Sequence, residues 1–445
     1  MERATNISLA AGIVGATALA GILVIDATAN NTSNPGPAKR AVGDASARQL
    51  ADGQQVFRFD TFGDEAFWGD TLRLHQALAG AKNGGVGPGV SPRAALAAGL
   101  KVDADALPDD LKENIRAGNV NLDDPATTVA LLRLDAVVGV KGLFDSGGNL
   151  RSMGVQCALC HSTVDDSFAA GIGKRLDGWA NRDLNIGQII SLAPNLAPYM
   201  QLLGVDEATL RKVLASWGPG RFDALLDKDG KAFRPDGGQA GTVIPPAFGL
   251  AGVNLHTWTG MGSVPYWNAY VAVTEMHGSG TFIDKRLNDS ARYPVAARAG
   301  TSEVRNTPDL VTEKLPALHA YQLSLAAPKP PQGSFDAAAA ERGKAVFTGR
   351  AQCASCHVPP LYTEPGDNLH APSEVGIDSF QADRSPTQKY RTAPLAGLWT
   401  HQKPGFYHDG RFATLMEVVE HYNTTRQLAL SDQEKRDLVE YLKSL

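Results

Sequence analysis

The apolar and polar positions in the last quarter of the chain predict a compact helical domain. Residues 335–347 carry small and apolar side chains at helical spacing, and Gly343 and Phe347 share one face of that helix. Residues 430–445 start with a Ser-x-x-Glu capping box and continue with apolar side chains three or four positions apart. This last stripe consists of Leu438, Tyr441, Leu442 and Leu445. The pattern predicts a first and a last helix that frame the domain.

The earlier part of the chain predicts further helices and one hairpin. Two short alternating runs at 137–156 flank the Gly147-Gly148 pair, which is typical of a β-hairpin. Helices or helix-turn segments are predicted within 69–78, 175–194, 206–226, 263–280 and 307–325. Helices therefore outnumber strands in the predicted fold.

Composition refines this picture only slightly. The chain has 445 residues, which fits two or three domains, and an apolar fraction of 43%, which is enough for packed cores. The 46 glycines and 26 prolines indicate many turns and long connections. With a net charge of −5 and a pI of about 6.1, the chain lacks the basic excess of nucleic-acid-binding proteins, so we expect no nucleic-acid partner.

The N-terminus carries an apolar run that predicts export. Residues 7–25 are nearly all apolar or small, Arg3 gives a weak positive flank, and Ala27–Ala29 looks like a small-residue cleavage site. We interpret 1–29 as a signal peptide or, because the run approaches bilayer-spanning length, as an uncleaved inner-membrane anchor. The polar stretch 30–45 would be a flexible spacer. Both interpretations place the folded part in the periplasm.

The candidate chemistry lies in two copies of the pattern Cys-x-x-Cys-His. The first motif holds Cys157, Cys160 and His161, and the second holds Cys353, Cys356 and His357, so that together they use all four cysteines. A disulfide within one motif closes a very short loop, and disulfides between the motifs leave both histidines unexplained. Zinc modules usually gather their ligands within a short stretch, whereas these pairs are 196 positions apart. A thioredoxin-like motif would occur once and would need no adjacent histidine.

Covalent haem explains both the spacing and the histidine. In Cys-x-x-Cys-His the two thiols bond to the vinyl groups of a haem, and the imidazole that follows becomes an axial ligand of the iron. The sequence therefore predicts two covalently bound haem c groups. All four cysteines would be attachment points, and His161 and His357 would be the axial ligands.

These motifs indicate two haem domains. We predict an N-terminal haem domain with a large insertion at 46–326, a proline-rich linker at 327–334 and a C-terminal cytochrome c domain at 335–445. The predicted fold class is mainly α, with two cytochrome c-like haem domains, long loops and a few short β-hairpins.

The insertion is inferred from a second Gly-x-x-x-Phe pair. Gly53 and Phe57 have the same separation as the glycine and Phe347 of the C-terminal domain. However, Cys157 lies 100 residues after Phe57, whereas Cys353 lies six residues after Phe347. Either the first haem domain carries a large insertion, or the match is due to chance.

The chain resembles the bacterial di-haem cytochrome c peroxidase superfamily. The resemblance rests on CALCH, CASCH and above all on TAPLAGLWTHQKPGFYHDGRFATLMEVVEHYN at 392–423. It is specific over about 331–445 and loose over 45–330, where the chain looks like a branch nearer the di-haem rubber oxygenases. It implies that one haem is an electron-transfer centre and that the other can be reactive. It also implies a homodimer and leaves a bound calcium ion open.

The resemblance also concerns the second axial position of the C-terminal haem. The peroxidases usually have a methionine in the helix after the His-Asp-Gly turn, whereas here Tyr422 takes that place, which resembles the methylamine-utilisation di-haem enzyme. The helical period puts Tyr422 on the apolar face and Met416 and His421 away from it. Tyr422 is then an iron ligand or close neighbour of the haem, or a core tyrosine. His408, in the turn, contacts the haem or fixes the loop.

The other side of the first haem has no clear candidate. The peroxidases often place a histidine soon after the first motif, but here no histidine occurs between His161 and His256. An open or water-bound iron is one alternative, and the other candidates are His75, Met153, Met200, His256, Met261, Met276 and His277. Polar groups near this haem, or surface salt bridges, are expected from Arg182, Asp183, Arg221 and Asp223.

Together these features predict an exported di-haem c-type cytochrome that transfers electrons, with peroxidase-type activity at one haem as an additional role. A haem-dependent oxygenase or oxidase, and a non-catalytic haem-based ligand-binding protein, are the alternatives. We expect a periplasmic redox partner, a small electron donor or acceptor protein, and the acidic balance favours a basic docking face on it.

Overall fold

The computed structural model describes residues 37–401 and 403–445. Its contacts divide the chain into two units, Met1–Ala45 and Ser46–Leu445. The predicted signal peptide or anchor at 1–29 lies outside the described residues. Within the described ranges, no helix is both long and apolar enough to cross a membrane.

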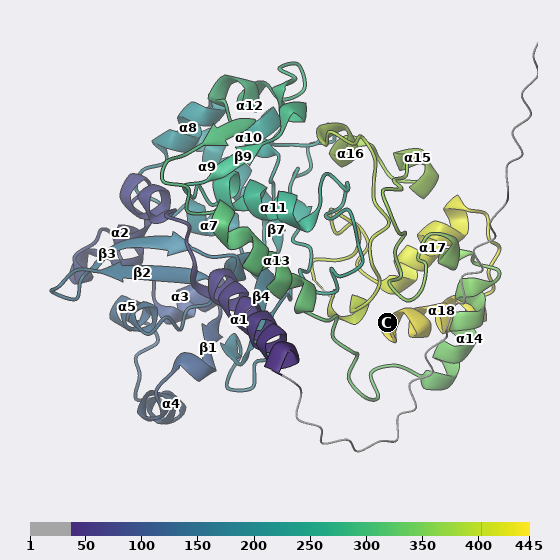
Figure 1. Cartoon of the computed structure of the whole chain (residues 1–445), viewed down its shortest axis with the longest axis horizontal. Helices are drawn as coiled ribbons and strands as arrows, with labels where there is room; N and C mark the ends of the chain where they lie inside the picture. Colours follow the sequence, from purple (N-terminus) through teal and green to yellow (C-terminus); the bar gives the residue numbers. More distant parts are fainter. Residues whose placement is uncertain (1–36, 402) are drawn as a thin grey trace, which may run out of the picture. The chain divides into compact units, whose positions relative to one another are not determined.

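The described part of the chain is mainly helical, as predicted (Figure 1). The helices before the first motif are α1 (Pro37–Phe59), α2 (Leu74–Ala79), α3 (Pro92–Ala97), α4 (Asp109–Arg116) and α5 (Pro125–Arg133). From the first motif to the linker they are α6 (Ala158–His161), α7 (Ile186–Ile190), α8 (Ala197–Leu203), α9 (Glu207–Trp217), α10 (Leu226–Asp229), α11 (Val264–Tyr270), α12 (Pro294–Ala299) and α13 (Leu315–Ser324). The C-terminal ones are α14 (Ala337–Thr348), α15 (Pro372–Val375), α16 (Phe380–Arg384), α17 (Leu415–Thr425) and α18 (Asp432–Lys443).

Strands form only small two-stranded sheets in the described ranges. The antiparallel pairs are β2 (Val140–Phe144) with β3 (Leu150–Val155), β4 (Ser162–Val164) with β6 (Arg175–Asp177), β7 (Arg221–Phe222) with β8 (Thr242–Val243), and β9 (Thr281–Ile283) with β10 (Glu303–Arg305). The parallel pair is β1 (Val102–Asp103) with β5 (Ile172–Gly173). The pair β2–β3 is the predicted hairpin, and its second strand ends two residues before Cys157.

The C-terminal domain is closed by a tight crossing of α14 and α18. A side chain at Gly343 would collide with the backbone carbonyl of Asp437 and with Cβ of Tyr441, so only glycine lets the helices approach this closely. Phe347, one turn further along α14, packs against Tyr441 with ring centroids 5.1 Å apart. The capping box predicted at the start of α18 is present between Ser431 and Glu434.

The same crossing occurs in the first half of the chain, between α1 and α13. A side chain at Gly53 would collide with the carbonyl of Ala317 and with Cβ of Tyr321. Phe57 is fully buried, and its ring centroid lies 5.6 Å from that of Tyr321. The two contacts on α13 are four residues apart, as they are on α18. The Gly-x-x-x-Phe match is therefore structural, and the residues between Phe57 and the first motif are an insertion in a repeated framework.

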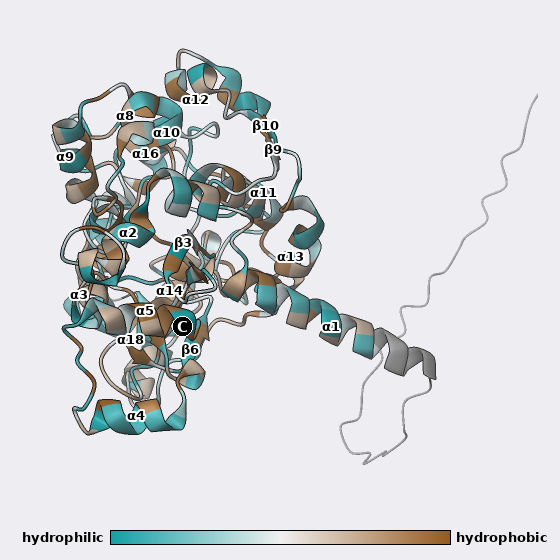
Figure 2. Ribbon diagram, turned by 90° about the vertical axis from the view of Figure 1, so that its left-hand side faces the viewer, coloured by the Kyte–Doolittle hydropathy of each residue, from teal (hydrophilic) through white to brown (hydrophobic). Residues whose placement is uncertain are grey.

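The buried apolar side chains of the described residues form two hydrophobic clusters. The buried residues of the larger cluster run from Phe57 to Tyr321, and those of the smaller cluster run from Phe347 to Leu442. By contrast, α4 is hydrophilic along most of its length and contains no fully buried residue (Figure 2). The insertion thus contributes both core packing, through α2 and α5, and surface elements such as α4.

Buried ion pairs join the two predicted haem domains. Arg384 of α16 is 1% exposed, and its guanidinium group bonds to Asp229 at 2.7 Å and to Asp223 at 2.9 Å. Burial raises the pKa of Asp223 to about 6 despite the neighbouring arginine. Because removing one partner would leave an uncompensated buried charge, these bonds fix the local contact between the domains.

The boundaries differ in one place from the predicted ones. Helix α1 starts at Pro37, inside the stretch 30–45 predicted as a flexible spacer, because this segment contains good helix formers and a proline suited to a first helical turn. The spacer is thus shorter than predicted. The proline-rich stretch 327–334 lies between α13 and α14 and contains no helix.

Candidate haem sites

The first motif sits where the β2–β3 hairpin turns into the short helix α6. The amide of Gln156 donates to the carbonyl of Gly139, which ends the hairpin, and the amide of His161 donates to the carbonyl of Cys157 at 3.2 Å. Both cysteines are half-buried and pack against the larger hydrophobic cluster, and burial raises the pKa of Cys157 to about 12. The motif therefore presents two thiols and one imidazole from a single turn.

The orientation of His161 is fixed by a backbone carbonyl. Its Nδ1 atom lies 3.2 Å from the carbonyl oxygen of Pro245, which requires the proton on Nδ1 and leaves the lone pair on Nε2. Burial lowers the pKa of His161 to about 4, so the ring is neutral. A neutral imidazole with a free Nε2 and a carbonyl on its other nitrogen is the arrangement that metal-ligating histidines adopt.

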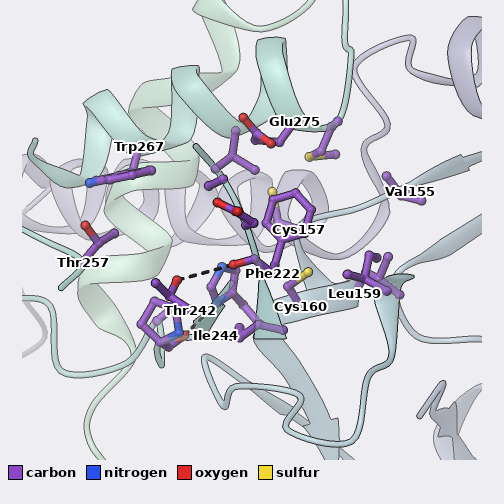
Figure 3. Close-up of a pocket in the computed structure, with 18 of the residues that line it drawn as sticks. Val155, Cys157, Leu159, Cys160, Phe222, Thr242, Ile244, Thr257, Trp267 and Glu275 are labelled. Carbon is purple, nitrogen blue, oxygen red and sulfur yellow. Dashed lines mark hydrogen bonds between the residues drawn. The ribbon is translucent and has the colours of Figure 1, made fainter. Parts of the chain in front are cut away.

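A cavity of about 350 Å³ opens beside this histidine. Cys157, Cys160 and His161 all line it, and most of the remaining wall is aliphatic or aromatic. Figure 3 shows Cys157 and Cys160 facing the cavity, with Phe222 and Ile244 beside them, Trp267 and Thr257 on one side and Glu275 above. Such a concave, mostly apolar site with a few polar groups suits a flat cofactor such as haem.

The second motif repeats the local chemistry of the first. Residues Cys353–Ser355 form one 3-10 turn, and the amide of His357 donates to the carbonyl of Cys353 at 2.9 Å. The Nδ1 atom of His357 lies 3.0 Å from the carbonyl oxygen of Tyr362, so Nε2 is again free. Burial lowers the pKa of His357 below its ordinary value. Phe347, at the α14–α18 crossing, packs against this ring with centroids 6.5 Å apart.

The residues present at both motifs therefore fit haem c. Each provides a pair of thiols on one turn, an imidazole with a free Nε2 and a carbonyl that orients it. Among the described residues, ligand atoms of Cys356, Glu364 and His370 also lie within 4.8 Å of one another, but this group includes neither His357 nor Cys353, and both ring nitrogens of His370 already contact carboxylates.

Tyr422 lies close to the second motif, on α17. Burial raises the pKa of its hydroxyl, and the nearby Cys353 and Cys356 add to this effect, so the phenol lies near the two thiols of the motif. Its ring centroid is 6.2 Å from that of Tyr407. Met416, predicted to point away from the core, is half-buried and packs against the smaller cluster, so the inner face of α17 is wider than predicted. The role of Tyr422 as an iron ligand stays a prediction.

His408 lies in the turn that precedes α17 and is almost fully buried. Its ring stacks on Tyr390 with centroids 5.0 Å apart, and burial lowers its pKa to about 4. Its carbonyl accepts a bond from the amide of Val243, which belongs to the N-terminal region. These contacts fit the loop-fixing role of His408, and its haem contact stays a prediction.

His408 is also one of three residues at this turn whose side chains together could bind a metal ion. Ligand atoms of Asp378, His408 and Asp409 lie within 4.8 Å of one another. Arg234 and Arg411 bond to both aspartates and already supply positive charge there. A bound calcium ion is therefore not assigned to this group.

Most of the residues proposed as the second axial ligand of the first haem line the cavity beside the first motif. Those that line it are Met153, His256, Met261, Met276 and His277, while His75 and Met200 do not. His256 is held by a contact of its Nε2 atom with the carbonyl of Val253 at 3.0 Å. His277 is stacked on Phe67 with ring centroids 3.6 Å apart. Both rings are neutral, because burial lowers their pKa to about 4 and about 3.

Sequence reasoning missed Glu275, the most unusual group in this cavity. Its side chain is only 9% exposed, and burial raises its pKa to about 8. Its Oε1 atom accepts a bond from the hydroxyl of Thr274 at 3.0 Å and lies 3.5 Å from Nζ of the fully buried Lys228. The signal was available, because one acidic residue interrupts the apolar run at 264–276. Helix α11 forms the first part of this run and continues as a π-helical turn at Val271–Glu275. Such a distortion is frequent at functional sites.

The four polar residues proposed near the first haem have different roles. Asp183 bonds to Lys101 and Lys403 at 2.7 Å each, and Arg221 donates to the carbonyl of Asp409. Asp223 bonds to the buried arginine of α16 and also lines the cavity. Arg182 donates to the carbonyl of Lys403 and has no acidic partner in the described residues, and burial lowers its pKa to about 9. Of these four residues, only Asp183 forms the simple surface salt bridges that were expected.

Comparisons with known proteins support the same assignment. The family model "Cytochrome c" matches residues 340–445. The methylamine utilization protein MauG of Methylorubrum extorquens is 28% identical over 230 residues. This match covers 45% of the present chain and 63% of MauG, which is less than two thirds of that relative.

Similarity to solved structures is more distant. The hydrazine synthase of Kuenenia stuttgartiensis shares 18% identity with a TM-score of 0.26, over 46% of this chain and 73% of the other. A MauG-like protein associated with microbial copper homeostasis shares 18% identity with a TM-score of 0.31, over 48% of this chain and 76% of the other.

The second motif, the α14–α18 crossing and the family match define a cytochrome c domain that binds haem c. The match over 340–445 and the similarity to MauG support the predicted resemblance of the chain to the di-haem cytochrome c peroxidase superfamily.

Proposed function

We propose that this protein is an exported di-haem c-type cytochrome in which the second haem transfers electrons and the first carries out peroxide chemistry. The proposal assigns one covalent haem to each motif. It follows from the repeated chemistry of the two sites, since both histidines keep Nε2 free and both cysteine pairs lie on one turn.

The observation that carries the proposal is the acidic group in the first cavity. Glu275 lines the same cavity as His161 and is almost entirely removed from water. A carboxyl group with a pKa of about 8 exchanges protons readily near neutral pH, which is what general acid–base catalysis requires. A pure electron carrier has no use for such a group, so this cavity favours a reaction over simple transfer.

When bound, the haem supplies the redox chemistry, and the protein supplies acid–base groups and a dry cavity. Glu275 is placed to accept a proton from a peroxide in the cavity and to return it to the oxygen that leaves as water. Lys228 and Thr274 hold the carboxyl group in position. Reduction of peroxide to two water molecules also consumes two electrons and two protons, and the electrons would come from the redox partner through the second haem.

Tyr422 would serve the electron-transfer haem. An anionic oxygen ligand favours ferric iron, whereas a methionine ligand raises the reduction potential. Tyr422 as a ligand would therefore give the second haem a lower potential than an ordinary methionine-ligated cytochrome.

Export and partner complete the proposal. The apolar run at 7–25 would direct the chain to the periplasm, where haem c is attached, either as a cleaved signal or as an anchor. The net charge of −5 favours a redox partner that presents a basic face. A homodimer belongs to the proposal through the superfamily resemblance.

Replacement of Glu275 tests the catalytic part. In Glu275→Gln we expect the rate of peroxide reduction, measured with a reduced electron donor, to fall by about 10²- to 10⁴-fold, because the acid–base group is lost. The wild-type rate should rise with pH up to about 8, since Glu275 must be deprotonated to accept a proton, and the variant should lose this rise.

Glu303→Gln is the matched control. Glu303 is exposed and pairs with Arg305 on the surface, so the rate and its pH profile should not change. A Glu275→Gln variant with wild-type peroxide kinetics would contradict the catalytic assignment. Oxygen consumption without peroxide would instead favour the oxygenase or oxidase alternative.

A further inference from the structure

One end of the first cavity holds buried hydrogen-bond donors that have no acceptor. Arg391 lines this cavity, and its Nε atom donates to the carbonyl of Thr257 at 2.9 Å. Its Nη1 atom is buried and has no hydrogen-bond partner. Burial lowers the pKa of Arg391 to about 10, and no carboxylate of the described residues pairs with it. This differs from Arg384, whose guanidinium group bonds to two aspartates.

Trp267 provides a second donor at the same end. Its Nε1 atom is buried without a partner, and its ring lines the cavity. In Figure 3 Trp267 lies beside Thr257, the residue whose carbonyl accepts the hydrogen bond from Arg391.

 The same view shows Val155 and Leu159 at the opposite side, next to Cys160. The two unpartnered donors therefore lie away from the end where the thiols would bond to haem.

Buried donors of this kind need an anion. A guanidinium group removed from water and left without a counter-charge is costly, and so is a buried N–H without an acceptor. Two parallel N–H groups of arginine match the geometry of a carboxylate. The ligand chemistry at this end of the cavity is therefore that of a carboxylate.

A carboxylate here has two sources. Haem carries two propionate carboxylates on the edge away from its vinyl groups, and the vinyl groups are bonded by the cysteines in haem c. The alternative is a free carboxylate ligand or substrate in the cavity. The position of the donors, away from Cys157 and Cys160, favours the haem itself.

We propose that Arg391 and Trp267 bind a propionate of the haem attached to Cys157 and Cys160. This inference rests on the proposed haem at the first motif. Arg391 belongs to the predicted C-terminal domain and Trp267 to the N-terminal one, so both domains build the first haem site. The wall contributed by the C-terminal domain continues through Ala393, Pro394, Ala396 and His401, which line the same cavity.

The test replaces the charge and the N–H donor separately in the full-length haem protein. Arg391→Gln removes the charge, Arg391→Lys retains it, and Trp267→Phe removes the indole N–H together with part of the ring while keeping an aromatic side chain. Arg93→Gln is the matched control, because Arg93 is exposed and pairs with the exposed Asp123 at the surface. Intact mass first establishes that two haems are attached, which separates failure of this inference from failure of the proposed function.

Two readouts report on the propionate without using activity. A redox titration of Arg391→Gln should show one haem with a lower reduction potential and the other unchanged, because loss of a nearby positive charge disfavours the reduced haem. Resonance Raman spectra should show a shifted propionate bending band in Arg391→Gln and in Trp267→Phe. Arg391→Lys should largely restore the potential, and Arg93→Gln should match the wild type.

Unchanged potentials and an unchanged propionate band in Trp267→Phe and in a folded Arg391→Gln variant would overturn the inference. Added benzoate, as a free carboxylate probe, distinguishes the other source. If benzoate perturbs the wild-type spectrum but not that of Arg391→Gln, while the propionate band is the same in both, then the site binds a free carboxylate and not the haem.

Discussion

At the residue scale, the histidines of the two Cys-x-x-Cys-His motifs show how far the sequence alone reaches. The spacing of Cys-x-x-Cys-His predicts the role of His161 and His357, because it is set by the chemistry of one turn and needs no tertiary contact. The carbonyls that orient these rings belong to Pro245 and Tyr362. The first of these lies far along the chain, so only the fold reveals it.

Glu275 marks the limit of prediction at this scale. Its neighbours Thr274 and Lys228 become visible only once α10 and the π-helical end of α11 are packed together. The raised pKa depends on that burial and not on the local sequence. A site residue defined by its surroundings cannot be found from spacing.

The role of Tyr422 as an iron ligand can be tested by a single substitution. If its oxygen ligates the second haem, Tyr422→Phe should change the optical and spin-resonance spectra of that haem, because one axial ligand is lost. Tyr293→Phe is the control, since Tyr293 is buried in the N-terminal region and does not line the first cavity. Identical spectra for Tyr422→Phe and the wild type would make Tyr422 a core residue.

At the scale of elements, the repeated helix crossing is the clearest feature. The Gly-x-x-x-Phe pairs predicted similar helices, but the sequence did not decide between an insertion and chance. The collisions that a side chain would meet at Gly53 and Gly343 decide this, because each involves a backbone carbonyl and a tyrosine four residues further on. The partner helix α13 was predicted as a helix, but its match with α18 was not.

The crossing predicts a difference between two glycines of the same helix. Gly53→Ala should destabilise the protein by about 1–3 kcal/mol, because the methyl group meets backbone atoms of α13. Gly43→Ala should be neutral or stabilising by up to about 1 kcal/mol, because nothing lies within 4 Å and alanine favours helix. Denaturant unfolding of both variants measures the difference, and equal effects would argue against the crossing at Gly53.

At the scale of the whole molecule, the sequence predicted two domains but not how they share a site. One hydrophobic cluster surrounds Phe57 and another surrounds Phe347, while the backbone contacts keep Ser46–Leu445 in one unit. Two features connect the predicted domains. Arg384 is buried against aspartates of the N-terminal region, and Arg391 lines the cavity of the first motif. Such contacts join residues far apart in the chain, and no local period or spacing encodes them.

The central claim is that haem is bonded to both cysteine pairs, and the intact mass of the exported protein tests it most directly. We expect the mass of the polypeptide plus two haem groups, and loss of one group in Cys157→Ala or in Cys353→Ala, with about half of the haem stain remaining. A bare polypeptide, or zinc in place of haem, would contradict the account.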